Sequence, residues 1–401
     1  MTELAGNAVL DDAIDDRAAA ALPALIAGPD RRPALWKRSA WWLGRLIRTV
    51  WGIASVIVLL AVLAAVPLLN FAALGYLLAA EGRIARGGRL RDGIPLMEIA
   101  PRLGSIALGM WLWTLPLRFM AGSVADAALI DPGGGAERRL FIVQTILWAV
   151  ISLHLILALA RGGSLMCFFR PIKNGRWLWK RLRSGDYWSR AGQLVNDFIE
   201  PLKFGRHWWL GVRGFVVAMA WLLIPSALLS ALRKLEPGQG LLTIGGGLLL
   251  VWVFSWVPFL QARFAAEESL RAGFELRKTR ELWRHAPIAW LITCVVISVM
   301  SLPLYLFKVA LPPADAIWFV TLIFMASILP TRILTGWAYR RAQWKLANGR
   351  RSHLLVRFGC RALLLPVLGL YVFLLFFTQF IDEHGKQALF EHHAFLLPWP
   401  G

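Results

Sequence analysis

The sequence predicts an all-α fold, a polytopic integral membrane helical bundle of about seven full spans plus one proline-broken segment that is re-entrant or interfacial. Three observations predict this class. Hydrophobic residues make up 58% of the 401 positions, which is too many for an ordinary soluble domain. They are concentrated in runs of about 20 residues, the length at which a helix crosses a bilayer. The positive charge lies between these runs.

The charge distribution predicts which connecting segments face the cytoplasm. The chain carries 44 Lys and Arg residues against 24 Asp and Glu residues, a formal net charge of +20. Cytoplasmic loops of membrane proteins are enriched in Lys and Arg, so the basic segments are predicted to lie inside the cell. These segments are residues 1–49, 81–103, 161–208, 263–286 and 340–361. The alternation predicts a bacterial inner-membrane protein with a cytoplasmic N-terminus and a periplasmic or extracellular C-terminus.

The first 49 residues are predicted to stay on the cytoplasmic side. Residues 1–33 are alanine-rich and acidic, without the basic and then apolar order of a cleavable signal peptide, and are expected to form a disordered tail. In residues 34–49, Trp, Leu and Ile alternate with basic side chains at helical spacing. This pattern predicts an amphipathic helix in the headgroup region.

Residues 50–80 begin the transmembrane domain, which is predicted to extend over residues 50–381. This apolar run is too long for one span and too short for two, and basic segments flank it on both sides. Pro67 lies inside it, and a proline there frees a backbone carbonyl and kinks a helix. We therefore expect a re-entrant or interfacial break at residues 66–70. The alternative is a single span over 50–69, with segment 81–103 outside.

The remaining apolar runs are predicted to form three hairpins and a final span. These runs are residues 104–121 with 140–160, 209–232 with 241–262, 287–309 with 316–338, and then 362–381. Residues 263–284 are expected to continue as a helix into the cytoplasm, with Glu267 and Arg271 spaced for an ion pair. The tail 382–401 is predicted to lie outside and to be solvated.

A short motif is repeated within the chain. Residues 66–70 read Val-Pro-Leu-Leu-Asn, and residues 257–261 read Val-Pro-Phe-Leu-Gln. Each copy is followed by a glutamate, Glu81 or Glu267, and then by a basic stretch. Transporter folds are often built from internal repeats, although a chance match in a leucine-rich chain is an equal explanation.

Polar residues within the apolar runs are candidates for function, because burying them in a bilayer is costly. Four of them form a candidate intramembrane polar site: Asn70, Arg118, Gln144 and His154. Alternative explanations are snorkelling for Arg118 and a hydrogen bond to a neighbouring helix for His154. Arg332 lies near a predicted span end, where snorkelling explains it.

The basic, Trp-rich segments are candidates for binding anionic lipid. Each Lys or Arg near an anionic leaflet contributes roughly 1 kcal/mol, and Trp rings favour the headgroup level. Residues 188–201 also have the apolar spacing of an amphipathic helix. The candidate headgroup contacts are Lys37, Arg38, Lys173, Arg176, Lys180, Arg181, Arg183, Trp177 and Trp179.

Several function classes lack support in the sequence. The three cysteines are far apart, and no metal-ligand spacing, nucleophile–base arrangement or phosphate-binding loop is present. We therefore expect no catalytic residues, cofactor or metal site. The positive charge flanks membrane-spanning runs, which argues for a lipid surface rather than nucleic acid. Protein partners and a homo-oligomer remain open.

The stretch Pro67-Leu68-Leu69-Asn70, followed by Gly75-Tyr76-Leu77-Leu78 and a basic segment, resembles a family of bacterial and archaeal polytopic membrane proteins of unknown function. The resemblance implies an integral inner-membrane protein and no activity. Two functions fit these patterns. One is a non-enzymatic, membrane-organising or interaction protein whose basic loops bind anionic lipid or partners. The other is a transporter or permease component with a polar site near Asn70 and His154.

Overall fold

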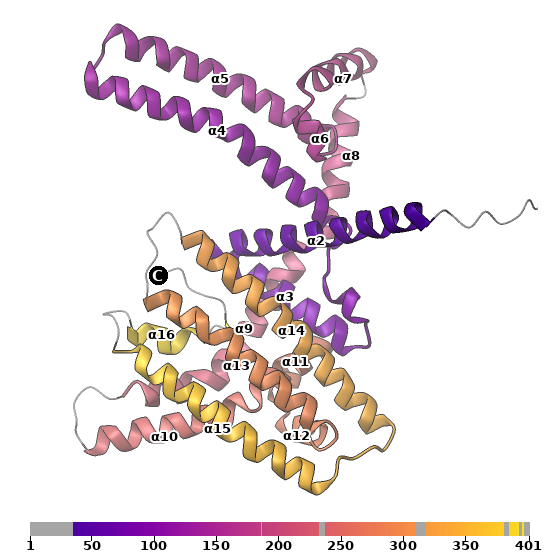
Figure 1. The fold of residues 1–401 in the computed structure, drawn as a ribbon, viewed down its shortest axis with the longest axis vertical. Coiled ribbons are helices and arrows are strands. Elements are labelled where there is room, and N and C mark those ends of the chain that lie inside the picture. The colour runs from indigo at the N-terminus through magenta and orange to yellow at the C-terminus, as the bar shows by residue number, and fades with distance from the viewer. Residues whose placement is uncertain are drawn as a thin grey trace, which may run out of the picture. The chain divides into compact units, whose positions relative to one another are not determined.

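A computed structural model describes residues 35–185, 187–231, 237–309, 317–380, 385–392 and 395–396. Within these ranges all regular structure is helical, as Figure 1 shows. The chain divides into two compact units, Met1–Val50 and Trp51–Gly401. The predicted tail, residues 1–33, lies outside the described residues.

The longer helices follow the predicted apolar runs, and shorter ones form the connecting segments. The α-helices are α2 (Leu35–Ala65), α3 (Asn70–Ala85), α4 (Ala100–Ile130), α5 (Gly135–Ala160), α6 (Leu165–Phe168), α7 (Pro171–Ser184), α8 (Tyr187–Ile199), α9 (Phe204–Leu229), α10 (Pro237–Phe254), α11 (Val257–Glu267), α12 (Leu276–Trp283), α13 (Pro287–Val309), α14 (Ile317–Ala347), α15 (Leu354–Thr378) and α16 (Gly385–Glu391). The 3-10 helices are η1 (Leu90–Gly93), η2 (Glu200–Leu202) and η3 (Leu270–Phe274).

Length and composition identify the helices that can cross a membrane. Among the described residues, six single helices qualify, and two bent pairs raise the number to as many as eight. The single helices contain Trp41–Ala65, Ala100–Ile130, Gly135–Ala160, Glu200–Leu229, Val320–Ala347 and Leu354–Thr378. The bent pairs are Gly238–Phe254 with Val257–Glu267, bent by 43°, and Leu276–Trp283 with Pro287–Leu302, bent by 109°. The chain is therefore a polytopic helical bundle, as the sequence predicts.

The segment 34–49 belongs to a longer helix. Its described part continues into the following apolar run, so that α2 is one helix up to Ala65. Trp41 and Trp42 are both exposed, and Arg45 lies over their rings. An interfacial position for these residues stays a prediction.

The break expected at residues 66–70 is present. α2 ends at Ala65, Leu68 has a positive φ of 67°, and α3 begins at Asn70. Most of α3 is buried, and it packs mainly against α9, α14 and α11. The packing is close because α3 has glycines at its contacts: a Cβ on Gly75 would overlap the backbone of α9, and one on Gly82 would overlap α11.

The predicted span 241–262 is broken. α10 ends at Phe254, and α11 begins at Val257 with Pro258 in its first turn, where the missing amide of proline costs no helical hydrogen bond. The break is thus built like the one before α3, with a proline close to the start of a short buried helix.

The helix expected over residues 263–284 is wrong. α11 ends at Glu267 because Glu268 adopts a left-handed conformation, with φ of 50°, and the chain continues as η3 and α12. Glu267 pairs with Arg263, at 2.7 Å, and Arg271 approaches Glu275, at 3.8 Å. The predicted pair of Glu267 and Arg271 required one continuous helix, and the helix stops between them.

The C-terminal segment also differs from the solvated tail that the sequence predicts. Leu389, His392, Phe395 and Leu396 are all buried, and the three apolar side chains join the core formed by α9 to α15. A second core cluster lies around α3 and includes residues of α2, α9, α11 and α14. The described part of the C-terminal segment is therefore part of the bundle.

Ion pairs connect three of the basic segments at one end of the bundle. Glu268, just after α11, pairs with Arg206 at 2.6 Å and lies 3.7 Å from Arg86. Arg86 also donates to the carbonyl oxygens of Ala265 and Ala266, at 3.0 Å each. The end of α3, the start of α9 and the end of α11 therefore meet.

The fourth basic segment reaches the same end. Arg340 in the last part of α14 donates to the Gly88 carbonyl oxygen at 2.6 Å. The Ser352 amide, before α15, donates to the Arg284 carbonyl oxygen at 3.2 Å. Each of the four segments that are predicted to be cytoplasmic loops thus contacts at least one of the others.

Candidate functional site

A polar cluster lies inside the bundle where α3, α11 and α14 meet. Arg332 Nη1 donates to Glu81 Oε2 at 3.1 Å and to Gln261 Oε1 at 2.8 Å. Arg332 Nη2 and Gln261 Nε2 both donate to the main-chain carbonyl oxygen of Phe395, at 3.2 Å each. The cluster therefore joins three helices and the C-terminal segment.

This cluster is fully enclosed by protein. Glu81 and Gln261 have no exposed surface, and Arg332 is 3% exposed. Two of its polar atoms, Glu81 Oε1 and Arg332 Nε, have no hydrogen-bond partner among the described residues. Burying a charged pair costs desolvation energy that the pairing recovers only with good geometry and further hydrogen bonds. Such a pair inside an apolar bundle is a candidate for function rather than a simple source of stability.

The repeated motif contributes to the cluster. Gln261 is the last residue of the second copy, and Asn70 is the last residue of the first. The helices that follow the two breaks, α3 and α11, pack against each other, with Gly82 against Ala265. Glu81 belongs to the helix after the first copy, but Arg332 comes from α14, outside both copies.

The interpretation of Arg332 as a snorkelling side chain is wrong. Arg332 lies near the middle of α14 (Ile317–Ala347), because this helix continues well beyond the predicted span end at residue 338. A guanidinium at mid-helix does not reach the headgroup region, and Glu81 and Gln261 provide its partners instead.

The C-terminal segment closes one side of the cluster. His392 Nε2 lies 2.6 Å from the Ser226 hydroxyl of α9, and the His392 ring packs edge-on against Phe254. The Phe395 ring stacks on Phe254, with centroids 5.5 Å apart. Aromatic packing on α10 and one polar contact to α9 thus hold the Phe395 carbonyl oxygen against Arg332.

The four residues of the predicted intramembrane site do not come together. Asn70 is buried at the start of α3, and its Oδ1 has no partner among the described residues. Arg118 is exposed on α4, and Gln144 is partly exposed on α5. His154 is buried, with Nε2 2.9 Å from the Phe168 carbonyl oxygen and its ring 4.5 Å from Trp113. The contacts of His154 fit the alternative explanation, a bond to a neighbouring helix.

The candidate headgroup contacts of segment 161–208 lie on α7. Asn174 anchors this helix: it is fully buried, accepts from Arg161 at 2.6 Å and donates to the Cys167 carbonyl oxygen at 2.8 Å. The side chains of Lys37 and Arg38, on α2, lie outside the described residues.

α7 has three distinct faces at helical spacing. One face, less exposed, carries Asn174, Trp177, Leu178 and Arg181. The next face is apolar and exposed, and carries Ile172, Trp179 and Leu182. The third face is basic and exposed, and carries Lys173, Arg176, Lys180 and Arg183. A helix that presents an apolar stripe beside a basic stripe has the amphipathic character of an interfacial helix.

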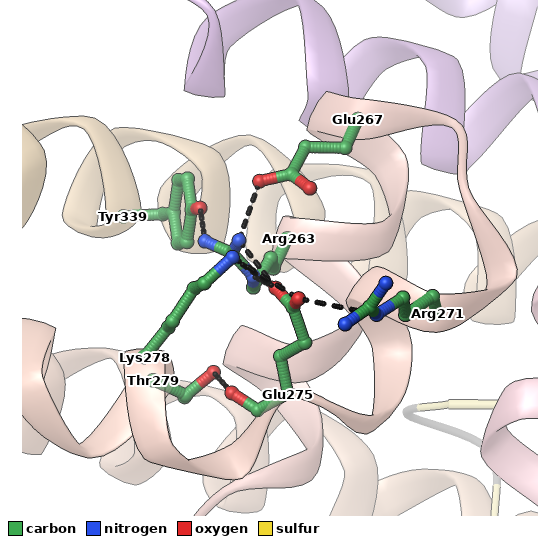
Figure 2. Close-up of polar contacts among 7 residues, drawn as sticks. All are labelled: Arg263, Glu267, Arg271, Glu275, Lys278, Thr279 and Tyr339. Carbon is green, nitrogen blue, oxygen red and sulfur yellow. Dashed lines mark hydrogen bonds and ion pairs between the residues drawn. The ribbon is translucent and has the colours of Figure 1, made fainter.

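A second ionic network surrounds Arg263, as Figure 2 shows. Its guanidinium lies between Glu275, with nitrogen–oxygen distances of 2.9 and 2.6 Å, and Glu267, at 2.7 Å. It also donates to the Tyr339 hydroxyl of α14 at 3.2 Å. The network joins α11, the start of α12 and α14, and so fixes the basic segment 263–286 against the bundle.

Glu275 is the acceptor that this network shares most widely. Lys278 lies 3.0 Å from its carboxylate, and in Figure 2 its ammonium group is beside the Arg263 guanidinium, with Arg271 on the other side of Glu275. The hydrogen bonds from Lys278 and Arg263 hold the pKa of the Glu275 carboxyl below its ordinary value. Glu275 is therefore charged at neutral pH.

The central cluster of Glu81, Gln261 and Arg332 cannot be recognised from local sequence patterns. The sequence pattern marks Glu81 only as a glutamate that follows the repeated motif, and it places Arg332 near a span end. The sequence does contain a signal for both residues. Glu81 follows residues 70–80 of α3, none of which is charged, and Arg332 lies in an otherwise uncharged part of α14. What the sequence did not contain is which helices would meet.

One protein family matches part of this chain. The profile of a family described as "Protein of unknown function (DUF4013)" matches residues 198–312. This region spans α9 to α13 and includes Gln261 and the Arg263 network apart from Tyr339, but neither Glu81 nor Arg332. The match agrees with the expected resemblance to an uncharacterised family, although it lies outside the stretch 67–78 that suggested one. Comparison with curated proteins and with solved structures finds no match.

Proposed function

We propose that this protein is a non-enzymatic membrane-organising or interaction protein of the bacterial inner membrane, which binds anionic lipid headgroups through α7. The observation that carries the proposal is the division of α7 into a docked face, an exposed apolar stripe and an exposed basic stripe. In a bilayer interface the apolar stripe enters the acyl boundary and the basic stripe meets the phosphates.

The orientation of the chain supports the same assignment. The four basic segments contact one another at one end of the bundle, which agrees with a common cytoplasmic side. The cytoplasmic leaflet is the anionic one, and its attraction for each basic side chain is roughly 1 kcal/mol. In this orientation the N-terminus is cytoplasmic, and the C-terminal segment that follows α15 begins on the periplasmic or extracellular side.

Reporter fusions at residue 92 test the orientation. Segment 81–103 is expected to report a cytoplasmic position, because Gly88 is bonded to Arg340 and Arg86 lies beside Glu268. A periplasmic signal at residue 92 contradicts this orientation and restores the alternative, a single span over residues 50–69.

Native mass spectrometry of the full chain tests lipid binding by α7. The protein in neutral detergent is titrated with phosphatidylglycerol or with phosphatidylcholine. The variant Lys180→Gln/Arg183→Gln removes two charges of the basic stripe, about 2 kcal/mol of attraction or roughly 30-fold in affinity for phosphatidylglycerol. Arg138→Gln/Arg139→Gln is the matched control, since both residues are exposed at the start of α5, outside the basic end.

Two results contradict the proposal. Equal binding of the two lipids to the wild-type chain means that charge does not select the lipid. Equal loss of phosphatidylglycerol binding in the two double variants means that net charge, and not the basic stripe of α7, is responsible.

One observation favours the alternative, a transporter or permease component. The buried cluster of Glu81, Gln261 and Arg332 supplies an intramembrane polar site, although not at the predicted positions near Asn70 and His154. Its paired charges and unpartnered atoms are features of solute and ion pathways. The test compares solute uptake by proteoliposomes that contain the wild-type protein with uptake by those that contain the variant Glu81→Gln. Uptake that is lost in the variant supports this alternative. Equal uptake by both excludes the cluster from the pathway.

A further inference from the structure

The Phe395 carbonyl oxygen occupies a position that two buried donors define. Arg332 Nη2 and Gln261 Nε2 come from different helices, and each lies 3.2 Å from this one oxygen. Both donor side chains are buried, so solvent does not compete for them. A guanidinium and an amide that converge on one point form a donor set for an oxygen acceptor.

One edge of the Arg332 guanidinium is only half used. Nε and Nη2 form the edge whose two N–H bonds run parallel, the arrangement that pairs with both oxygens of a carboxylate. Nη2 is bonded to the Phe395 carbonyl oxygen, and Nε has no partner among the described residues. A main-chain carbonyl has one oxygen and satisfies one of the two donors. A carboxylate in the same place satisfies both.

The surroundings of this position are apolar and aromatic. The Phe395 ring stacks on Phe254, which also packs edge-on against Tyr371 at 5.5 Å. Phe395 and Leu396 are each 3% exposed. The C-terminal segment thus places the Phe395 ring against apolar side chains and the Phe395 carbonyl oxygen against Arg332.

We propose that Phe395 and Leu396 are an internal pseudo-ligand in a site for a small carboxylate with an apolar body, and that such a molecule displaces the C-terminal segment when it binds. Arg332 binds the carboxylate along its Nε–Nη2 edge, Gln261 donates to one of its oxygens, and Phe254 packs against the apolar part. This site is independent of lipid binding by α7.

Charge balance defines the protonation of the bound state. Glu81 already neutralises Arg332, and the other contributors to the site, Gln261 and the Phe395 carbonyl, are neutral. Two carboxylates beside one guanidinium in a dry site do not both keep their charge. The ligand therefore enters together with one proton, which it shares with Glu81.

The C-terminal segment is held by contacts that a ligand replaces. The polar contacts that hold its described residues to helices include the Ser226–His392 hydrogen bond and the two bonds of 3.2 Å to the Phe395 carbonyl oxygen. The ligand takes over the second set and adds the bond to Nε. Release of the segment loses the Ser226 contact and apolar packing, and the ligand restores part of this packing.

Calorimetric titration of the full chain in detergent with 3-phenylpropanoate tests the site. The variant Phe395→Ala/Leu396→Ala weakens the internal competitor, and we expect it to bind 3-phenylpropanoate at least about ten-fold more tightly than the wild-type chain. The matched control is Phe380→Ala, an exposed aromatic residue just after α15, which should bind like the wild type. The methyl ester of the probe, which has no carboxylate, should bind at least about ten-fold more weakly than the acid.

Two outcomes overturn the proposal: a Phe395→Ala/Leu396→Ala variant that does not bind the acid, or one that binds acid and ester equally. Arg332→Lys on this background keeps the charge but loses the parallel N–H edge, so the preference for the acid should disappear. Retention of the full preference in Arg332→Lys also overturns it.

Displacement of the segment has a separate readout that does not depend on these variants folding. Leu396→Cys in the full chain places a thiol at a buried position, and the native cysteines are buried too. We expect 3-phenylpropanoate to raise the rate of maleimide labelling at residue 396 several-fold, and the methyl ester to leave it unchanged. Unchanged labelling with the acid contradicts displacement.

Discussion

The hairpin of α4 and α5 and the bundle core around α3 use polar residues in opposite ways. Both regions consist of apolar helices, and in Figure 1 α4 and α5 lie side by side. In the hairpin, Arg118 is exposed, and His154 bonds to the nearby carbonyl of Phe168. In the core, Glu81 and Arg332 come from helices far apart in sequence and pair with each other. Depth within an apolar run therefore says little about whether a charge is buried. The number of helices around it decides.

The difference extends to the apolar surface. Only 6% of the most apolar window of α4 and 17% of that of α5 are buried, against 50% for α14. The hairpin thus exposes span-length apolar surface on most sides, as helices facing lipid do. The core gains its specificity from buried polar contacts, each of which requires a particular partner.

The largest predicted effect comes from breaking the core ion pair. Glu81→Ala leaves Arg332 buried without its carboxylate, which should lower the free energy of unfolding by about 3–5 kcal/mol. Arg118→Ala in the hairpin should change it by less than about 0.5 kcal/mol, because the side chain is exposed. Chemical denaturation in detergent measures both values. Similar losses in the two variants would remove the distinction between hairpin and core.

The next largest effect concerns Asn174, a buried polar residue outside the core that holds α7 in place by two hydrogen bonds. Asn174→Ala removes one acceptor and one donor from a fully buried position, and should cost about 1–3 kcal/mol locally. Because Asn174 ties α7 to Arg161 and Cys167, amide hydrogen exchange should rise over residues 171–184 and not over α3. Lys173→Ala, an exposed neighbour, is the control. A uniform rise across the chain would mean that Asn174 stabilises the whole fold.

The sequence predicts the positions of the helices in both regions better than it predicts the contacts between them. Apolar runs predict every long helix, because a span must bury its backbone polar groups in its own hydrogen bonds. Pro67 predicts the break before α3. Pro258 does not predict the equivalent break at Ser255 and Trp256, because a proline in the first turn of a helix also occurs without a bend.

Long-range pairing accounts for most of what the sequence leaves undetermined. Glu81 and Arg332 are 251 positions apart, and Gln261 reaches Phe395 across 134 positions. No local periodicity encodes such contacts. α7 is different: its three faces follow from spacing within one helix. The headgroup contacts stay a prediction, and two of the candidates, Trp177 and Arg181, lie on the less exposed face. The C-terminal segment lies at the other extreme, since its burial depends entirely on the bundle that it enters.

A smaller effect concerns the hydrogen bond between His154 and Phe168. His154→Phe keeps the aromatic contact with Trp113 but leaves the Phe168 carbonyl without this donor, which should cost about 1 kcal/mol. Unfolding in detergent measures the loss. A cost as large as that of Glu81→Ala would mean that His154 contributes as much stability as the core ion pair, and would weaken the contrast between the two regions.

The smallest effect is a pH dependence at the basic end, where Glu275 joins Arg263 and Lys278. Its pKa is lowered in the folded chain, so its charged form stabilises the fold above the ordinary carboxyl pKa of about 4, and this contribution is lost as the pH falls through the lowered value. The stability difference between the wild type and Glu275→Gln should therefore be greatest near neutral pH and should shrink in acid. Glu98→Gln, at an exposed carboxylate before α4, controls for lost charge. Melting curves from pH 7 downward measure both. If Glu98→Gln gives the same profile, the effect is a general one of surface charge, and the network around Arg263 has no share in it.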